Sequence, residues 1–198
     1  MARTQAAEYD QRREYIVEQA ARLYARDGFL GASVAELAKA CGSSKSAIYH
    51  YYPSKEDILF DVMHSHILAL DQAAGAASIK AGPGAEKLRG LARALMRLYV
   101  GAHNRHKVLL NELDQLPKAR RAQIVALQRG LIEVVEGALG GIEPRLGRDA
   151  GRLRAAAMLF FGMINWTHTW FDPKGAVSAE ALADMVVDMT LGGLPQVA

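Results

Sequence analysis

Apolar residues recur three and four positions apart along almost the whole chain, and no segment shows the sustained alternation of apolar and polar side chains that is typical of a strand. This spacing places the apolar side chains of each segment on one side of a helix. We therefore predict an all-α protein of about nine helices, separated by turns that contain glycine or proline. The predicted helices cover residues 10–27, 34–41, 45–51, 55–80, 85–103, 107–116, 118–139, 149–171 and 178–192.

Two short helices near the N-terminus have clear start and stop signals. Ser33 followed by Glu36 is the pattern of a capping box at a helix start, and Gly42 suits the end of that helix. Only two serines separate it from the next helical stretch, and two short helices joined by such a tight turn form a helix-turn-helix. We predict a three-helix DNA-binding domain at residues 1–55 and a helical ligand-binding and dimerisation domain at residues 56–198.

Charge favours contact with nucleic acid only in one part of the predicted first domain. The first 60 residues contain equal numbers of acidic and basic side chains, but no acidic residue lies between Glu36 and Glu56. A short, locally positive helix suits the major groove, where small side chains approach base edges and longer ones reach phosphates. The residues expected to contact DNA are Ser33, Ser44, Lys45, Ser46, Ala47, Tyr49, His50, Tyr51 and Lys55.

The overall composition is that of a folded globular protein, with 51% hydrophobic and 23% charged residues and a net charge of +3. The single cysteine, Cys41, has no partner for an internal disulfide, and we expect it to be a small buried side chain. No apolar run is long enough to span a membrane, and the N-terminal residues lack the apolar core of a signal peptide. From these features we expect a cytoplasmic protein.

The string SVAELAKACGSSKSAIYHYYPSKEDIL, residues 33–59, resembles the signature of the TetR (tetracycline repressor) family. It covers the turn, the whole third helix and the start of the fourth. Three positions depart from the usual pattern: Ser43 stands where Val or Ile is common, Ser46 where Gly is frequent, and Tyr52 where Phe is usual. The resemblance implies a transcriptional repressor that binds a palindromic operator as a homodimer and is released by a small effector.

A second string, FFGMINWTHTWFDPKGAVSAEALAD at residues 160–184, is similar to the corresponding stretch of TetR-family repressors that control fatty-acid, phenylacetate or sterol catabolism. Those repressors respond to acyl-CoA thioesters, so the resemblance implies an acyl-CoA effector and no cofactor. The charge distribution agrees, because residues 80–154 hold fifteen basic and seven acidic side chains. Arginine binds phosphate groups such as those of CoA well.

Candidate effector residues lie on two predicted helices. Arg89, Arg93 and Arg97 recur every four residues beside a stripe of leucines, and a second basic group lies at residues 118–121. The alternative is that these arginines belong to solvated helix faces. Asn165, Trp166 and Trp170 combine a polar group with two large aromatics, which suits an acyl pocket and equally a dimer core. The residues expected in a four-helix dimer interface are Met158, Phe161, Ile164, Leu182, Val186 and Met189.

The sequence gives less support to two other functions. An enzyme acting on an acyl-CoA is not favoured, because the chain has no Gly-x-Ser-x-Gly elbow, no phosphate-loop glycine pattern and no HExxH zinc motif. A repressor of multidrug-efflux type would sense apolar or cationic compounds and would need acidic and aromatic pocket walls. The basic residues of segment 80–154 argue against it.

Overall fold

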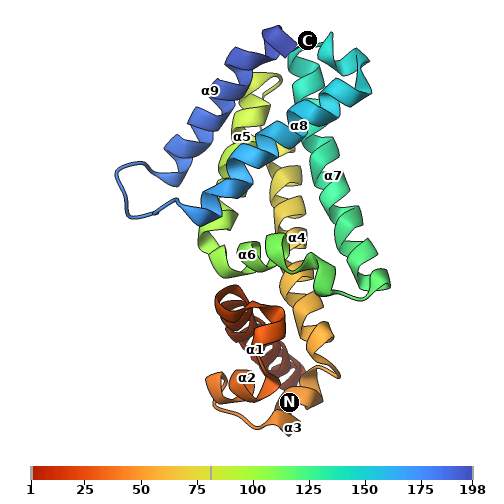
Figure 1. The fold of residues 1–198 in the computed structure, drawn as a ribbon, viewed down its shortest axis with the longest axis vertical. Coiled ribbons are helices and arrows are strands. Elements are labelled where there is room, and N and C mark those ends of the chain that lie inside the picture. Colours follow the sequence, from red (N-terminus) through yellow and green to blue (C-terminus); the bar gives the residue numbers. More distant parts are fainter. Residues whose placement is uncertain (1, 81, 198) are drawn as a thin grey trace. The chain divides into compact units, whose positions relative to one another are not determined.

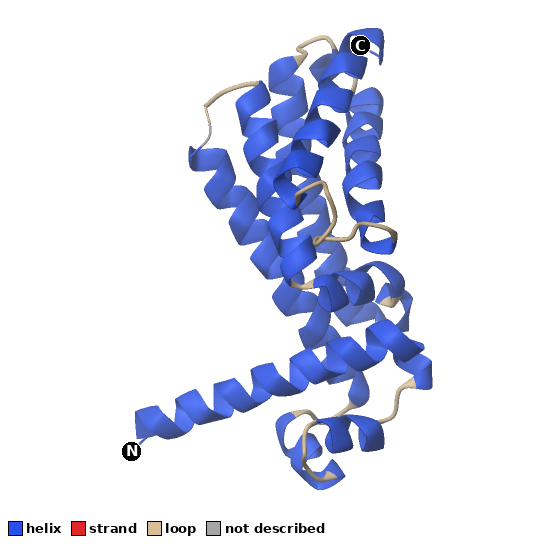
Figure 2. Ribbon diagram, turned by 90° about the vertical axis from the view of Figure 1, so that its left-hand side faces the viewer, coloured by secondary structure: helices blue, strands red, loops and turns tan. Residues whose placement is uncertain are grey.

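A computed structural model describes residues 2–80 and 82–197, with the side chains of residues 7–80 and 82–194. Every regular element in these ranges is helical, as Figure 2 shows, which confirms the predicted all-α class. The elements, labelled in Figure 1, are α1 (Ala2–Gly31), α2 (Val34–Ala40), α3 (Lys45–Tyr51), α4 (Lys55–Lys80), α5 (Ala85–Gly101), α6 (His103–Asn111), α7 (Lys118–Ile142), α8 (Ala150–Asn165) and α9 (Ala179–Val197), with 3₁₀ turns at Leu113–Gln115, Leu146–Arg148 and Trp166–Thr169.

Local chemistry explains most helix ends. Gly28 has φ 75° and ψ 161°, which kinks α1 directly after residue 27, where the first helix was predicted to end. The prediction of one helix over residues 149–171 was wrong at its C-terminal end, because α8 stops at Asn165 and a 3₁₀ turn follows. There the Thr167 hydroxyl donates to the carbonyl of Ile164 at 2.7 Å. Such local side-chain bonds compete with the continuing helix.

The chain divides into two compact units, each described here by itself. The first consists of the residues up to His66 together with Asn104–Ile124. Its core is built from apolar residues of α1 to α4, and Cys41 is buried among them as expected. The largest fully buried side chains of this core are Ile16, Leu37, Ile48, Ile58, Leu59 and Met63. Helix α6 and the beginning of α7 join this unit although they lie far along the chain.

The second unit consists of Ile67–His103 and the chain from Val125 onward. Helix α9 packs against both α5 and α8. Leu88, Leu91 and Leu95 on the apolar side of α5 are buried in its core together with Phe160 of α8, and Leu98 is half-buried. Among the described residues, no helix is long and apolar enough to cross a membrane.

Candidate nucleic-acid interface and sites of the second unit

The turn between α2 and α3 is held by side chains that cap both helices. The Ser33 hydroxyl accepts from the backbone N–H of Glu36 at 3.2 Å, and the Glu36 carboxylate accepts from the N–H of Ser33 at 2.8 Å. This is the predicted capping box. Ser44 caps α3 in the same way by accepting from the N–H of Ala47 at 3.2 Å. Gly42 in the turn has φ 59°, a backbone conformation that favours glycine.

Helix α3 presents a polar face and buries the opposite one. Ile48 is buried in the core of the first unit, and this contact fixes the rotation of the helix about its axis. The residues left exposed on α3 and its cap are Ser44, Lys45, Ser46, Tyr49 and His50, and Ala47 is half-buried between them. The structure therefore brings most of the predicted DNA-contacting residues together on one exposed face of a seven-residue helix.

Tyr51 and Lys55 lie in different surroundings. Tyr51 is half-buried, and its ring packs on the ring of Tyr9 at a centroid distance of 4.8 Å. The ammonium group of Lys55 donates to the carbonyl of Phe29 and lies 4.1 Å from the centre of the Phe29 ring. Desolvation by burial lowers the pKa of Lys55. The amine of Lys55 is thus bound within the first unit.

Tyr52, which replaces the usual Phe, joins three helices through its hydroxyl. It is buried in the core and donates to Oδ2 of Asp61 on α4 at 2.5 Å. Arg13 of α1 donates to the same carboxylate oxygen at 2.8 Å, and its guanidinium lies 5.0 Å from the centre of the Tyr52 ring. These contacts position the C-terminal end of α3 against α1 and α4.

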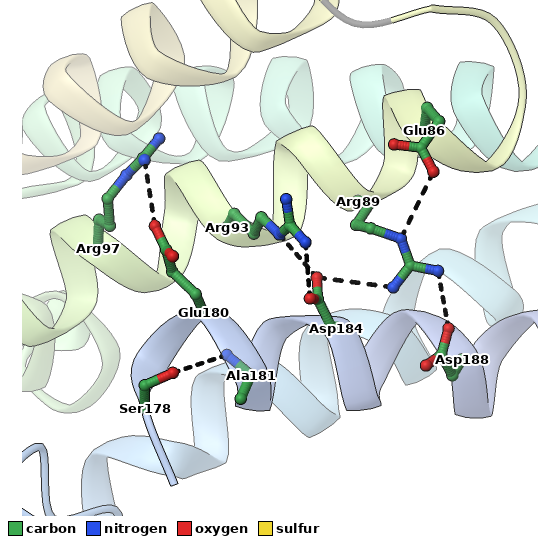
Figure 3. A network of polar contacts seen from close by, with 9 residues as sticks. All are labelled: Glu86, Arg89, Arg93, Arg97, Ser178, Glu180, Ala181, Asp184 and Asp188. Carbon is green, nitrogen blue, oxygen red and sulfur yellow. Dashed lines mark hydrogen bonds and ion pairs between the residues drawn. The ribbon is translucent and has the colours of Figure 1, made fainter.

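In the second unit, the three predicted ligand-binding arginines of α5 face acidic residues of α9 (Figure 3). Arg93 makes two hydrogen bonds of 2.7 Å to Asp184, and Arg89 lies 2.8 Å from Asp188 and 3.6 Å from Asp184. Arg97 makes a longer contact of 3.6 Å to Glu180. We call this set the α5–α9 ion-pair ladder. The carboxylates of α9 therefore neutralise part of the positive charge that was predicted to bind the phosphate groups of CoA.

One cavity of about 240 Å³ lies in the second unit at the C-terminal end of α5. Two of its polar side chains are anchored to backbone carbonyls, since Thr167 donates to Ile164 and Nδ1 of His168 lies 2.7 Å from the carbonyl oxygen of Asn165. Neither Asp, Glu, Lys nor Arg lines it. The lining residues are Tyr99, Val100, His103, Thr167, His168, Phe171 and Pro173.

The outer faces of α8 and α9 carry large exposed apolar side chains. Met189 is 68% exposed and Trp166 is 64% exposed, although both are apolar residues of regular or 3₁₀ elements. A surface hollow of about 550 Å³ runs between the two helices. It is lined by Met158, Leu159, Gly162, Met163, Trp166, Trp170, Leu182, Met185, Val186 and Met189.

Comparison with known proteins identifies the family. Residues 16–62 match the family model described as bacterial regulatory proteins, tetR family, and residues 81–194 match that of the tetracyclin repressor-like C-terminal domain. The chain belongs to the TetR family. A TetR-family transcriptional regulator from Bordetella parapertussis 12822 is 35% identical, with a TM-score of 0.87 over 90% of this chain and 93% of that one.

Two further relatives are informative about the second unit of this TetR-family chain. The structure of AibR in complex with isovaleryl coenzyme A and operator DNA is 29% identical, with a TM-score of 0.79 over 90% of this chain and 97% of that chain. The fatty acid metabolism regulator protein of Bacillus subtilis is 25% identical over 90% of this chain and 93% of its own length. The family models and the relatives that are named regulators agree that the chain is a transcriptional regulator.

The structure distributes the predicted second-unit residues differently from the sequence analysis. Trp166 and Trp170, predicted as pocket residues, lie at the α8–α9 hollow with four of the predicted interface residues. Phe161 and Ile164 are buried within the protomer itself. Asn165 is half-buried, and its side-chain oxygen has no hydrogen-bond partner among the described residues. The cavity at the end of α5 contains none of the predicted ligand residues, although four of its lining residues, Thr167, His168, Phe171 and Pro173, lie in the string 160–184 that is similar to acyl-CoA-responsive repressors.

Proposed function

We propose that this TetR-family chain is a homodimeric repressor that leaves its operator when an acyl-CoA thioester binds to the second unit. The observation that carries the DNA-binding part is the exposed face of α3, which has a single cation, three small or hydroxyl side chains and an exposed tyrosine over the buried Ile48. A helix of this kind reads base edges through small side chains and contacts phosphates through Lys45, Tyr49 and His50. Ser33 supports it from the start of α2.

The homodimer is proposed from the exposed apolar residues of α8 and α9. Soluble monomers rarely expose contiguous apolar surface on this scale, and such a surface usually marks an interaction site. A two-fold dimer brings the same patch of both copies together. We assign the interface to Met158, Leu159, Trp166, Met185 and Met189, with Leu182 and Val186 at the base of the hollow. Phe161 and Ile164 are left out, because they already belong to the protomer core.

A dimer also agrees with the DNA-binding part of the proposal. One recognition helix reads only a half-site, and a dimer places two such helices about 34 to 36 Å apart, one turn of the duplex. An effector that binds better to a dimer with a different spacing shifts the population away from the DNA-binding form. Release of the operator then needs no contact between effector and DNA.

The acyl-CoA effector is supported by what the relatives bind or regulate. AibR is seen with isovaleryl coenzyme A, and the Bacillus subtilis relative is named for fatty acid metabolism. Within the α5–α9 ion-pair ladder, Arg89 and Arg93 make the shorter contacts, and we assign them to holding α9 on α5. Arg97 is 63% exposed, and its only ion pair among the described residues is 3.6 Å long. We assign a phosphate of CoA to Arg97.

The experiment measures operator release directly. Genomic fragments bound by the purified protein are selected and sequenced, and fluorescence anisotropy on the recovered operator is repeated with isovaleryl-CoA and with free CoA. We expect tight binding that isovaleryl-CoA weakens and free CoA does not. Binding that no acyl-CoA weakens would refute the effector, and selection of no discrete DNA sequence would refute the operator-binding proposal.

Variants test the proposed interface residues. Lys45→Ala removes one phosphate contact and should lower the slope of log affinity against log salt by about 0.9. Tyr49→Ala should weaken operator binding about tenfold, as the loss of one contact to charged DNA does. Lys174→Ala removes an exposed cation of the second unit and is the matched control. Equal binding by all three variants would place the DNA contact elsewhere.

A further inference from the structure

We infer that the cavity at the C-terminal end of α5 is the acyl site of this regulator, and that it admits an acyl group of up to about eight non-hydrogen atoms and excludes long chains and steroid rings. This inference rests on the proposed acyl-CoA function and deepens it. It follows from the size of the cavity, from the chemistry of its walls and from its position beside Arg97.

The size limit comes from the volume of the cavity. A volume of about 240 Å³ corresponds to about eight water-sized groups, because one water occupies about 30 Å³ in the liquid. A short branched acyl group such as isovaleryl is smaller than this limit. A palmitoyl chain is about twice the limit, so the cavity holds only about half of it.

The walls are mainly apolar and hold no Asp, Glu, Lys or Arg, and Tyr99, His103 and His168 line them as well. Val100, Phe171 and Pro173 supply aliphatic and aromatic surface. The Thr167 hydroxyl donates its hydrogen bond to the carbonyl of Ile164, and the His168 ring is held by a hydrogen bond with the carbonyl of Asn165. No carboxylate lines the cavity to compensate an ammonium ion, so a cationic drug would lose its hydration without gaining a counter-charge. These walls favour the acyl thioester and not the cationic ligand of the alternative function.

The position of the cavity on α5 suits a ligand with a charged remainder. CoA is far too large for the cavity and must lie outside it. Arg97 precedes Val100 by three residues on the same helix, so the two side chains lie on the same side of α5. When the acyl group of a thioester lies against Val100, its CoA part therefore extends out of the cavity into solvent near Arg97, the most exposed arginine of the ion-pair ladder.

The test is a titration of the full-length protein by calorimetry with isovaleryl-CoA, decanoyl-CoA and palmitoyl-CoA, each below the concentration at which it forms micelles. We expect palmitoyl-CoA to bind at least about 100-fold more weakly than isovaleryl-CoA, because a hydrophobic pocket gains or loses about tenfold or more for each methylene that it accepts or rejects. If palmitoyl-CoA binds as tightly as isovaleryl-CoA, the size limit is wrong and the acyl-CoA function stands. If no thioester binds to protein that still binds its operator, the size limit and the acyl-CoA function are both wrong.

Two variants locate the site. Val100→Phe fills the cavity and should weaken isovaleryl-CoA binding at least about tenfold, whereas Leu98→Phe adds the same ring to a half-buried position of α5 outside the cavity. Phe171→Ala enlarges the cavity and should tighten decanoyl-CoA binding about tenfold. Unchanged operator binding shows that each variant is folded. Equal effects of Val100→Phe and Leu98→Phe, or no gain with Phe171→Ala, would overturn the assignment.

Discussion

A buried histidine in the first unit makes its stability sensitive to acid. His66 of α4 and His106 of α6 are 2% and 1% exposed, and Nε2 of His66 lies 3.2 Å from Nδ1 of His106. Arg105, on the same helix as His106, is held by Glu14 and lies 3.5 Å from Glu18. Burial, and then the positive charge of Arg105, lower the pKa of His66 from 6.5 to about 4.

The direction and size of the effect follow from proton linkage. The unfolded chain takes up a proton on His66 below about pH 6.5, whereas the folded chain does so only below about pH 4. The contribution of His66 to stability is therefore complete above pH 6.5 and is lost as the pH falls towards 4. The loss is about 1.4 kcal/mol for each pH unit within this window, or about 3 kcal/mol in total.

The assay is thermal or urea unfolding, followed by circular dichroism at half-unit steps from pH 7.5 to pH 4.5. His66→Gln keeps a group that hydrogen-bonds with His106 but does not titrate, so its stability should fall less steeply below pH 6.5 than that of the wild type. His50→Gln, at an exposed position of α3, is the control and should follow the wild type. Identical pH dependence of all three proteins would refute the reasoning.

Three further predictions test a hydrogen bond in the first unit, the proposed dimer interface and an ion pair in the second unit. Tyr52→Phe should lower the free energy of unfolding by about 1 to 2 kcal/mol through loss of the hydrogen bond to Asp61, and an unchanged urea midpoint would show that this hydroxyl is dispensable. Met189→Asp should convert the protein to monomers in sedimentation experiments, because it places a charge in the proposed apolar interface. The exposed Ile79→Asp should remain dimeric, and a dimeric Met189→Asp protein would move the interface elsewhere. Arg93→Glu should lower the Tm by repulsion from Asp184, and adding Asp184→Arg should restore it; failure of the reversed pair to recover, or a deficit independent of salt, would argue against an electrostatic role.

The sequence predicted the second and third helices and the capping box of the second well, because the signals there are local. Ser33, Glu36 and Gly42 each act on backbone groups within a few residues of themselves, so their roles are visible in the string. The same is true of the exposed face of α3, whose residue types and spacing also carry the family resemblance. The family models at residues 16–62 and 81–194 confirm that resemblance.

The arginines of α5 show where such reasoning ends. Their spacing correctly placed them on one side of a helix, but their partners are carboxylates about ninety residues away on α9. Counting charges along the chain cannot show which of them neutralise one another, because that depends on which helices pack together. Of the three arginines predicted to bind phosphate, only Arg97 is therefore proposed to do so.

The sequence by itself determined the helical class, the helix-turn-helix and the family, since each depends on hydrogen bonds and periodicity within short segments. Only the tertiary structure decided that α6 joins the first unit, that Trp166 and Trp170 face the α8–α9 hollow, and that a small cavity lies at the end of α5. A cavity is space left unfilled by side chains from distant segments, so its volume depends on how these segments pack. Local sequence patterns do not record that packing.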